Sequence, residues 1–170
     1  MRIIRDRHIV EDEWELLTPE SAPPLPARGK LIVPLTLWQA LRDDLHVRRD
    51  PIGVWLNPTD KPEALANDIS TLSLIAVNFP KFTDGRGYSV AQALRTRLHF
   101  RGELRAIGDV QRDQLFYMQR VGFNSFVLRS DEQLDTALGA FRDFSTSYQA
   151  SVDQPLPHYL RRAQLAEMAA

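Results

Sequence analysis

The chain has 170 residues, the length of one domain, and a net charge of −1 at pH 7 in an otherwise ordinary globular composition. It contains no cysteine, which excludes disulfides, thiolate metal sites and a cysteine nucleophile. The start of the chain lacks the apolar core of a signal peptide, and no apolar run is long enough to span a bilayer. We therefore expect a cytoplasmic protein without membrane contact.

The first 29 residues predict a small N-terminal β flap followed by a connector. Short apolar runs at 3–4, 8–10 and 14–17 favour short strands. The stretch 21–29, SAPPLPARG, contains three prolines, each of which removes a backbone donor and favours an extended residue before it. We place the main domain at 30–144 and a weakly periodic C-terminal tail at 145–170.

The segment 30–144 alternates short apolar runs with helical periodicity. Strands are expected near 30–35, 52–56, 72–79, 104–107 and 126–128, with a helical stretch after each. About five successive strand–helix units predict an α/β fold with a parallel sheet. Two architectures stay open, a curved partial (β/α) barrel and an open doubly wound sheet, and both place function at the carboxyl ends of the strands. The open edge of so small a sheet also makes a homodimer an expectation.

Local signals predict where the later helices begin and end. Ser89 and Gln92 fit a capping box at the start of the third helix, and 130–133 repeats that pattern before the fifth. Asp109 is a candidate N-cap for the fourth helix, which Gly122 would end, with Phe123 packing back on the helix.

The loop after the third strand, FPKFTDGRGYS, is rich in charged residues and glycine. Lys81 and Arg86 place cations near a helix N-terminus, and this arrangement is typical of a clamp for a small anion, with Asp84 inside the same loop. The alternative interpretation is a rigid turn in which Asp84 pairs with Arg86.

A second polar patch, GDVQRDQ, follows the fourth strand, and adjacent parallel strands would bring it to the same sheet edge. Asp109 is the best candidate for a general base, although the role of helix cap suits it equally. Arg129 ends the fifth strand and would either complete the cluster or pair with Asp131. The candidate catalytic residues are thus Asp109 and Tyr88, and the candidate substrate-binding residues are Lys81, Asp84, Arg86, Arg112, Gln114 and Arg129.

Charge is unevenly distributed along the chain. Nine basic and four acidic residues lie between Lys81 and Arg129, whereas the remainder carries twelve basic and eighteen acidic residues. This asymmetry favours a small anion or an acidic partner surface over no partner, and solvated helix faces remain the simpler alternative. Phosphate-cradle, dinucleotide and nucleic-acid recognition motifs are absent, and the four histidines are far apart in the sequence. We expect no metal, no cofactor and no nucleic acid.

The strings NFPKFTDGRGYS and RGELRAIGDVQRDQLFYMQRVGF resemble an uncharacterised bacterial family, domain of unknown function 934. Its members are often labelled probable oxidoreductases involved in sulfite reduction and are typically encoded beside a sulfite or nitrite reductase haemoprotein. The resemblance implies a role in sulfate assimilation, with the sulfite reductase haemoprotein as partner. The stretches that match the family contain the following polar residues: Lys81, Asp84, Arg86, Tyr88, Asp109, Arg112, Asp113 and Gln114. Asn124 departs from the acidic residue that members tend to have after Gly-Phe.

Two hypotheses follow for the function. In the first, the protein is an accessory subunit whose basic middle docks on the haemoprotein. In the second, it is a stand-alone enzyme that binds a small anionic substrate at the strand ends. A basic pocket would favour the enzyme, and the same residues spread over an open face would favour docking.

Overall fold

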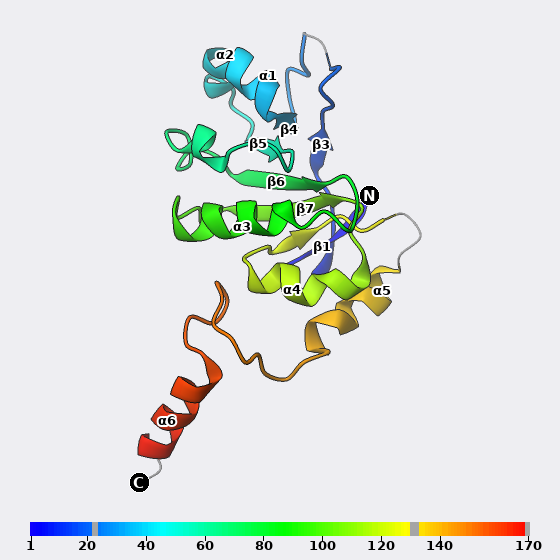
Figure 1. Ribbon diagram of the computed structural model, residues 1–170. Helices are drawn as coiled ribbons and strands as arrows, with labels where there is room; N and C mark the ends of the chain where they lie inside the picture. Colours follow the sequence, from blue (N-terminus) through cyan, green and yellow to red (C-terminus); the bar gives the residue numbers. More distant parts are fainter. Residues whose placement is uncertain (22–23, 130–132, 169–170) are drawn as a thin grey trace.

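The structure is a computed structural model that describes residues 1–21, 24–129 and 133–168 (Figure 1). One eight-stranded sheet runs through it in the order β2-β1-β8-β7-β6-β5-β4-β3. The strands are β1 (Arg2–Arg5), β2 (His8–Glu11), β3 (Trp14–Leu16), β4 (Lys30–Pro34), β5 (Ile52–Leu56), β6 (Leu74–Phe79), β7 (Glu103–Gly108) and β8 (Ser125–Phe126). From β3 to β8 neighbouring strands are parallel, whereas β1 is antiparallel to both β8 and β2.

The α/β class is confirmed, and the sheet is a curled half-barrel. Strands β3 to β8 follow one another in chain order, without the reversal of order that defines a doubly wound sheet. The open doubly wound alternative is therefore wrong. The prediction of a purely parallel sheet is also wrong, because the N-terminal hairpin adds β1 in the antiparallel direction. The strands expected in the first 29 residues are present, but they pair with β8 and β4 instead of forming a separate flap.

The helices are short. They are α1 (Leu35–Ala40), α2 (Arg42–His46), α3 (Arg86–Thr96), α4 (Leu115–Arg120), α5 (Leu134–Ala137) and α6 (His158–Met168), with 3₁₀ turns η1 (Pro62–Leu65), η2 (Arg112–Gln114) and η3 (Leu138–Arg142). In Figure 1, α6 lies at the end of a long connection, away from the sheet. No helix in the described ranges is both long enough and apolar enough to cross a bilayer.

The starts predicted for the third helix, at Ser89, and for the fourth helix, at Asp109, are both wrong. The third helix begins at Arg86, three residues before Ser89, because the carboxylate of Asp84 accepts the Arg86 N–H and so stabilises an earlier first turn. The capping box lies instead at Gln111 and Gln114, whose side chains and backbone amides satisfy each other at the start of η2. The capping box predicted at 130–133 falls on residues 130–132, outside the described part of the chain.

Both faces of the central strands are buried, as their near-continuous apolar sequences predict. Alternate side chains point to opposite sides, so Val54, Ile75 and Leu104 join the larger core, which includes α3 and α4 residues. Their neighbours form a smaller cluster on the other face, consisting of Ile32, Trp55, Leu74, Ala76 and Ile107.

The connection between β2 and β3 forces the sheet to curl. These strands form opposite edges of the sheet, yet only Asp12 and Glu13 separate them in sequence. Two linking residues allow the strand ends to lie at most about 10 Å apart. A flat sheet of eight strands would separate its edges by about 34 Å. The segment 8–16 therefore runs from one edge to the other and brings them together.

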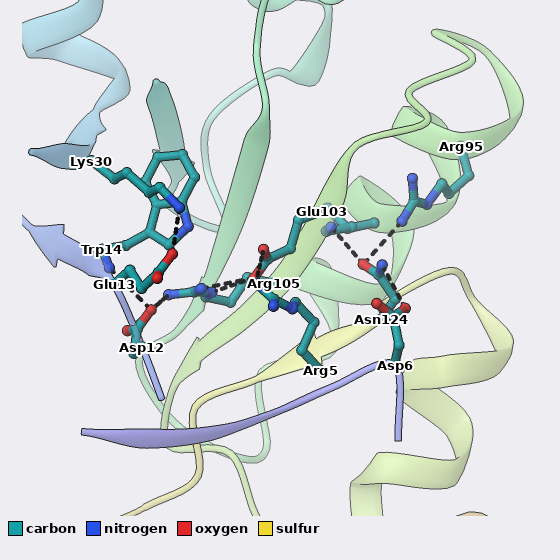
Figure 2. Close-up of polar contacts among 11 residues, drawn as sticks. Arg5, Asp6, Asp12, Glu13, Trp14, Lys30, Arg95, Glu103, Arg105 and Asn124 are labelled. Carbon is teal, nitrogen blue, oxygen red and sulfur yellow. Dashed lines mark hydrogen bonds and ion pairs between the residues drawn. The ribbon is translucent and has the colours of Figure 1, made fainter. Parts of the chain in front are cut away.

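A buried ion-pair network lies where this segment crosses (Figure 2). The guanidinium of Arg105, on β7, donates to Asp12 at 3.0 Å and to Glu103 at 2.9 and 2.7 Å. Asp12 also accepts the Trp14 N–H at 3.3 Å, and Arg5 lies 3.7 Å from Glu103. Two arginines and two carboxylates thus hold the N-terminal segment to the middle of the sheet.

Replacement of Asp12 by alanine is expected to lower the free energy of unfolding by about 3 kcal/mol, because it removes one partner of a buried ion pair. The side chains of Arg105 and Asp12 are only 1% and 6% exposed. The neighbouring Glu13 pairs with Lys30 but is 66% exposed, so Glu13→Ala is the matched control and should leave stability almost unchanged. Urea denaturation followed by circular dichroism measures both. Equal effects would mean that Asp12 does not hold the N-terminal segment in place.

Candidate functional site

The loops after β6 and β7 meet at the carboxyl ends of these strands, as predicted. Their contact depends on Gly108, which has a φ of +94°. A Cβ at this position would lie 2.4 Å from the carbonyl oxygen of Phe79 and 2.6 Å from Oδ1 of Asn78. Glycine therefore lets the end of β7 lie close against the end of β6, where the Asp109 N–H donates to the Phe79 carbonyl at 2.7 Å.

Three predicted residues form one hydrogen-bonded cluster on this contact. Oδ2 of Asp109 accepts the Phe82 N–H at 3.0 Å. Gln114 Nε2 donates to the carbonyl of Phe82 at 2.8 Å and to the hydroxyl of Tyr88 at 3.2 Å. The structure thus brings together Asp109, Gln114 and Tyr88 through the backbone of Phe82. The interpretation of Asp109 as a helix cap is wrong, because Asp109 binds the loop after β6 while Gln111 caps η2.

Tyr88 is a poor candidate for a base at neutral pH. Burial raises the pKa of its phenol above the ordinary value, and the nearby carboxylate of Asp113 raises it further, against a smaller lowering by the hydrogen bond from Gln114. Its ring packs edge-on against Phe79, with centroids 5.4 Å apart, and against Tyr117 at 5.2 Å. Tyr88 therefore stays protonated and is held by aromatic packing.

The predicted cations are mostly paired with carboxylates of the protein itself. Arg86 contacts Asp84 through Nε at 3.0 Å and through a terminal nitrogen at 2.7 Å, and this pairing holds the pKa of Asp84 below its usual range. Arg112 lies 2.9 Å from Asp143.

Arg129 and Lys81 complete the set of predicted cations. Arg129 lies 3.6 Å from Asp109, while Asp131, the alternative partner predicted for it, is outside the described residues. Lys81 is exposed, and within the described part of the chain it makes no ion pair.

The predicted residues form an open face. One of them, Arg129, lines a cavity of about 580 Å³ beside Arg2, Gln133 and Asp135 at the carboxyl end of β8. Arg112 points to η3 and does not join Lys81 and Arg86. Within the described residues, no group of three or more His, Asp or Glu side chains is arranged to hold a metal ion.

Sequence reasoning missed two aromatic residues of this face. Phe82 is 49% exposed and bonds to the cluster through its backbone, and Tyr117 is 55% exposed and packs against Tyr88. Phe82 carried a usable signal, because a phenylalanine inside a charged, glycine-rich loop has no core position to fill.

These features define a class of protein, a singly wound α/β half-barrel with an exposed polar and aromatic face at the carboxyl ends of its strands. The chain belongs to the family described as bacterial protein of unknown function (DUF934), whose model matches residues 53–159. The resemblance noted in the sequence is thereby confirmed. A search of curated proteins found no match.

Gly108→Ala is expected to destabilise the protein by about 2 kcal/mol, because alanine resists the positive φ and its Cβ would clash with the Phe79 carbonyl. The change should also speed hydrogen exchange at the Phe82 amide, which depends on Asp109. Gly85→Ala is the control, since Gly85 has an ordinary φ of −76° and nothing lies within 4 Å of the position that an alanine Cβ would occupy. Unchanged exchange at Phe82 in Gly108→Ala would show that the two loops do not depend on this crossing.

Proposed function

We propose that the protein is an accessory protein of assimilatory sulfite reduction that docks on the sulfite reductase haemoprotein through the face formed by the loops after β6 and β7. The observation that supports docking is that this face is open and carries exposed aromatic residues, while its arginines are paired internally. The choice of partner rests on the family resemblance.

The pairing of the arginines weakens the case for a small anionic substrate on this face. Asp84 occupies two nitrogens of Arg86 and also accepts its backbone N–H, so an incoming oxyanion competes with a carboxylate two residues away. The face is also open to water, where a single ion pair contributes little. A protein partner, in contrast, excludes that water over a large area as it docks.

The aromatic residues suit a protein interface. Tyrosine and phenylalanine are enriched in the cores of interfaces, where they bury a large area at a small entropic cost. Tyr117 is held in place by the ring of Tyr88, and Phe82 by backbone bonds to Asp109 and Gln114, so both are ordered before a partner arrives. The exposed cation of Lys81 directly precedes Phe82 in the sequence and would speed approach to an acidic surface.

Phe82→Asp is expected to weaken binding to the sulfite reductase haemoprotein about tenfold or more, because it places an unpaired charge in the interface. The control is Val47→Asp, which changes an exposed apolar residue at the end of α2, away from the loops after β6 and β7. Biolayer interferometry with the purified haemoprotein measures both variants, at low and at moderate salt. Binding should weaken with salt in the unaltered protein. Absence of binding, or equal losses in the two variants, would contradict the proposal.

A stand-alone enzyme remains the second candidate because of the cavity of about 580 Å³ at the end of β8. Arg2 and Arg129 line this cavity, and Arg129 also lies 3.6 Å from Asp109, so an anion held there would have a carboxylate within reach as a general base. Family members are labelled oxidoreductases, yet no nicotinamide, flavin or haem motif is evident in the sequence.

Calorimetric titration with sulfite, sulfate and phosphate distinguishes the two candidates. If the protein is an accessory subunit, none of these anions should produce heat that is lost in an Arg2→Ala, Arg129→Ala double variant. Arg86→Ala serves as the control, because Arg86 lies outside the cavity. Anion binding that disappears only in the double variant would favour the enzyme and contradict docking as the main function.

A further inference from the structure

We propose that a cavity between the C-terminal segment, α4 and η3 binds a phosphate monoester that carries an aromatic ring. The cavity has a volume of about 490 Å³, within the range of small-molecule sites. Its walls come from three parts of the chain: the turn between β1 and β2, the α4–η3 region, and the segment that leads into α6. It uses none of the residues of the docking face, so it can be tested independently.

Three arginines line this cavity: Arg7, Arg142 and Arg161. Arg7 lies over the ring of Phe141, with its guanidinium carbon 6.0 Å from the ring centroid. Arg161 donates to the Ser147 carbonyl at 2.5 Å. Within the described residues, neither of these arginines nor Arg142 lies in an ion pair with a carboxylate. This contrasts with Arg86 and Arg112 on the docking face.

The one carboxylate in the cavity wall is already compensated. Asp153 lies 3.5 Å from Arg120, whose side chain is largely buried behind it. The three cavity arginines therefore give a local charge of about +3, which favours a dianion over a singly charged anion. A phosphate monoester carries a charge of about −1.5 to −2 at neutral pH.

Two further features fit the phosphate group. The side chain of Arg161 belongs to the cavity wall and is fixed there by its bond to the Ser147 carbonyl. The hydroxyls of Ser145 and Thr146 also belong to the cavity wall. An oxyanion supplies acceptors for an arginine N–H and for hydroxyl donors together.

The aromatic part of the ligand is inferred from Phe116 and Phe144. Their ring centroids lie 4.9 Å apart at the wall of the cavity, and Phe144 is exposed despite its size. A planar ring that stacks on Phe144 would cover this apolar surface while its phosphate meets the arginines. The arrangement of an aromatic wall beside a cluster of cations selects a ligand with both parts.

The cavity is formed before any ligand binds, because the C-terminal segment is fastened to α4. The Ser151 hydroxyl donates to the carbonyl of Arg120 at 2.7 Å, and the Asp153 N–H donates to the same oxygen at 3.4 Å. The guanidinium of Arg120 also donates a hydrogen bond to the carbonyl of Gln149. Little ordering is then left to oppose binding.

The test is calorimetric titration of the full chain with phenyl phosphate, phenyl sulfate and inorganic phosphate. Phenyl phosphate should bind about tenfold or more tightly than either of the others. Arg142→Gln should weaken phenyl phosphate about tenfold, and Phe144→Ala should remove most of its advantage over inorganic phosphate. Arg142 and Phe144 are exposed, so both variants are expected to fold, and thermal unfolding checks this.

Arg86→Gln is the control for charge, and it should leave binding of phenyl phosphate unchanged. Absence of heat with phenyl phosphate at concentrations on the order of 1 mM would overturn the proposal. Binding that survives Arg142→Gln, or phenyl sulfate that binds as tightly as phenyl phosphate, would overturn it as well.

Discussion

The fold depends on a constraint in the first fifteen residues. Because Asp12 and Glu13 alone join strands at opposite edges of the sheet, the edges have to meet, and the sheet has to curl. The crossing would place the Asp12 carboxylate in an apolar interior, which is costly without a partner. Arg105 supplies that partner from β7, and Glu103 and Arg5 balance the remaining charge. A buried network of this kind fixes which strands meet more than it adds to stability.

The amino ends and the carboxyl ends of the parallel strands have different roles. The ion pairs around Arg105 and the Arg95 guanidinium, which donates to the carbonyls of Phe100, Gly102 and Gly122, hold the amino halves of β7 and β8 in place. At the carboxyl ends, the crossing at Gly108 aligns two loops whose polar groups face solvent. This division, with structure at one end and recognition at the other, is what parallel strands with helical connections produce in barrels generally.

The local sequence pattern was enough to predict the strands and the polar loops. It was not enough to predict which strands pair with each other. Hydrophobic runs indicated the strands of 30–144, and the order of charged residues after them located Asp109, Gln114 and Tyr88 at one edge. Nothing local in the N-terminal segment reveals that β1 pairs with β8 more than a hundred residues away. With β3 on one side and β1 and β2 on the other, the described sheet extends beyond the five strands that were expected, and its edges are β2 and β3. The oligomeric state stays a prediction.

Counting charges along the sequence also could not distinguish arginines that are available to bind an anion from arginines that stabilise the fold. The basic middle contains Arg86, Arg95, Arg105 and Arg112, yet in three dimensions these groups meet carboxylates or backbone carbonyls. Arg7, Arg142 and Arg161, which line a cavity and lie in no ion pair among the described residues, are outside that basic segment. Electrostatic potential depends on which partner each cation finds, and distant parts of the chain decide this. A site for an anion is therefore better sought among unpaired arginines than in the most basic stretch of sequence.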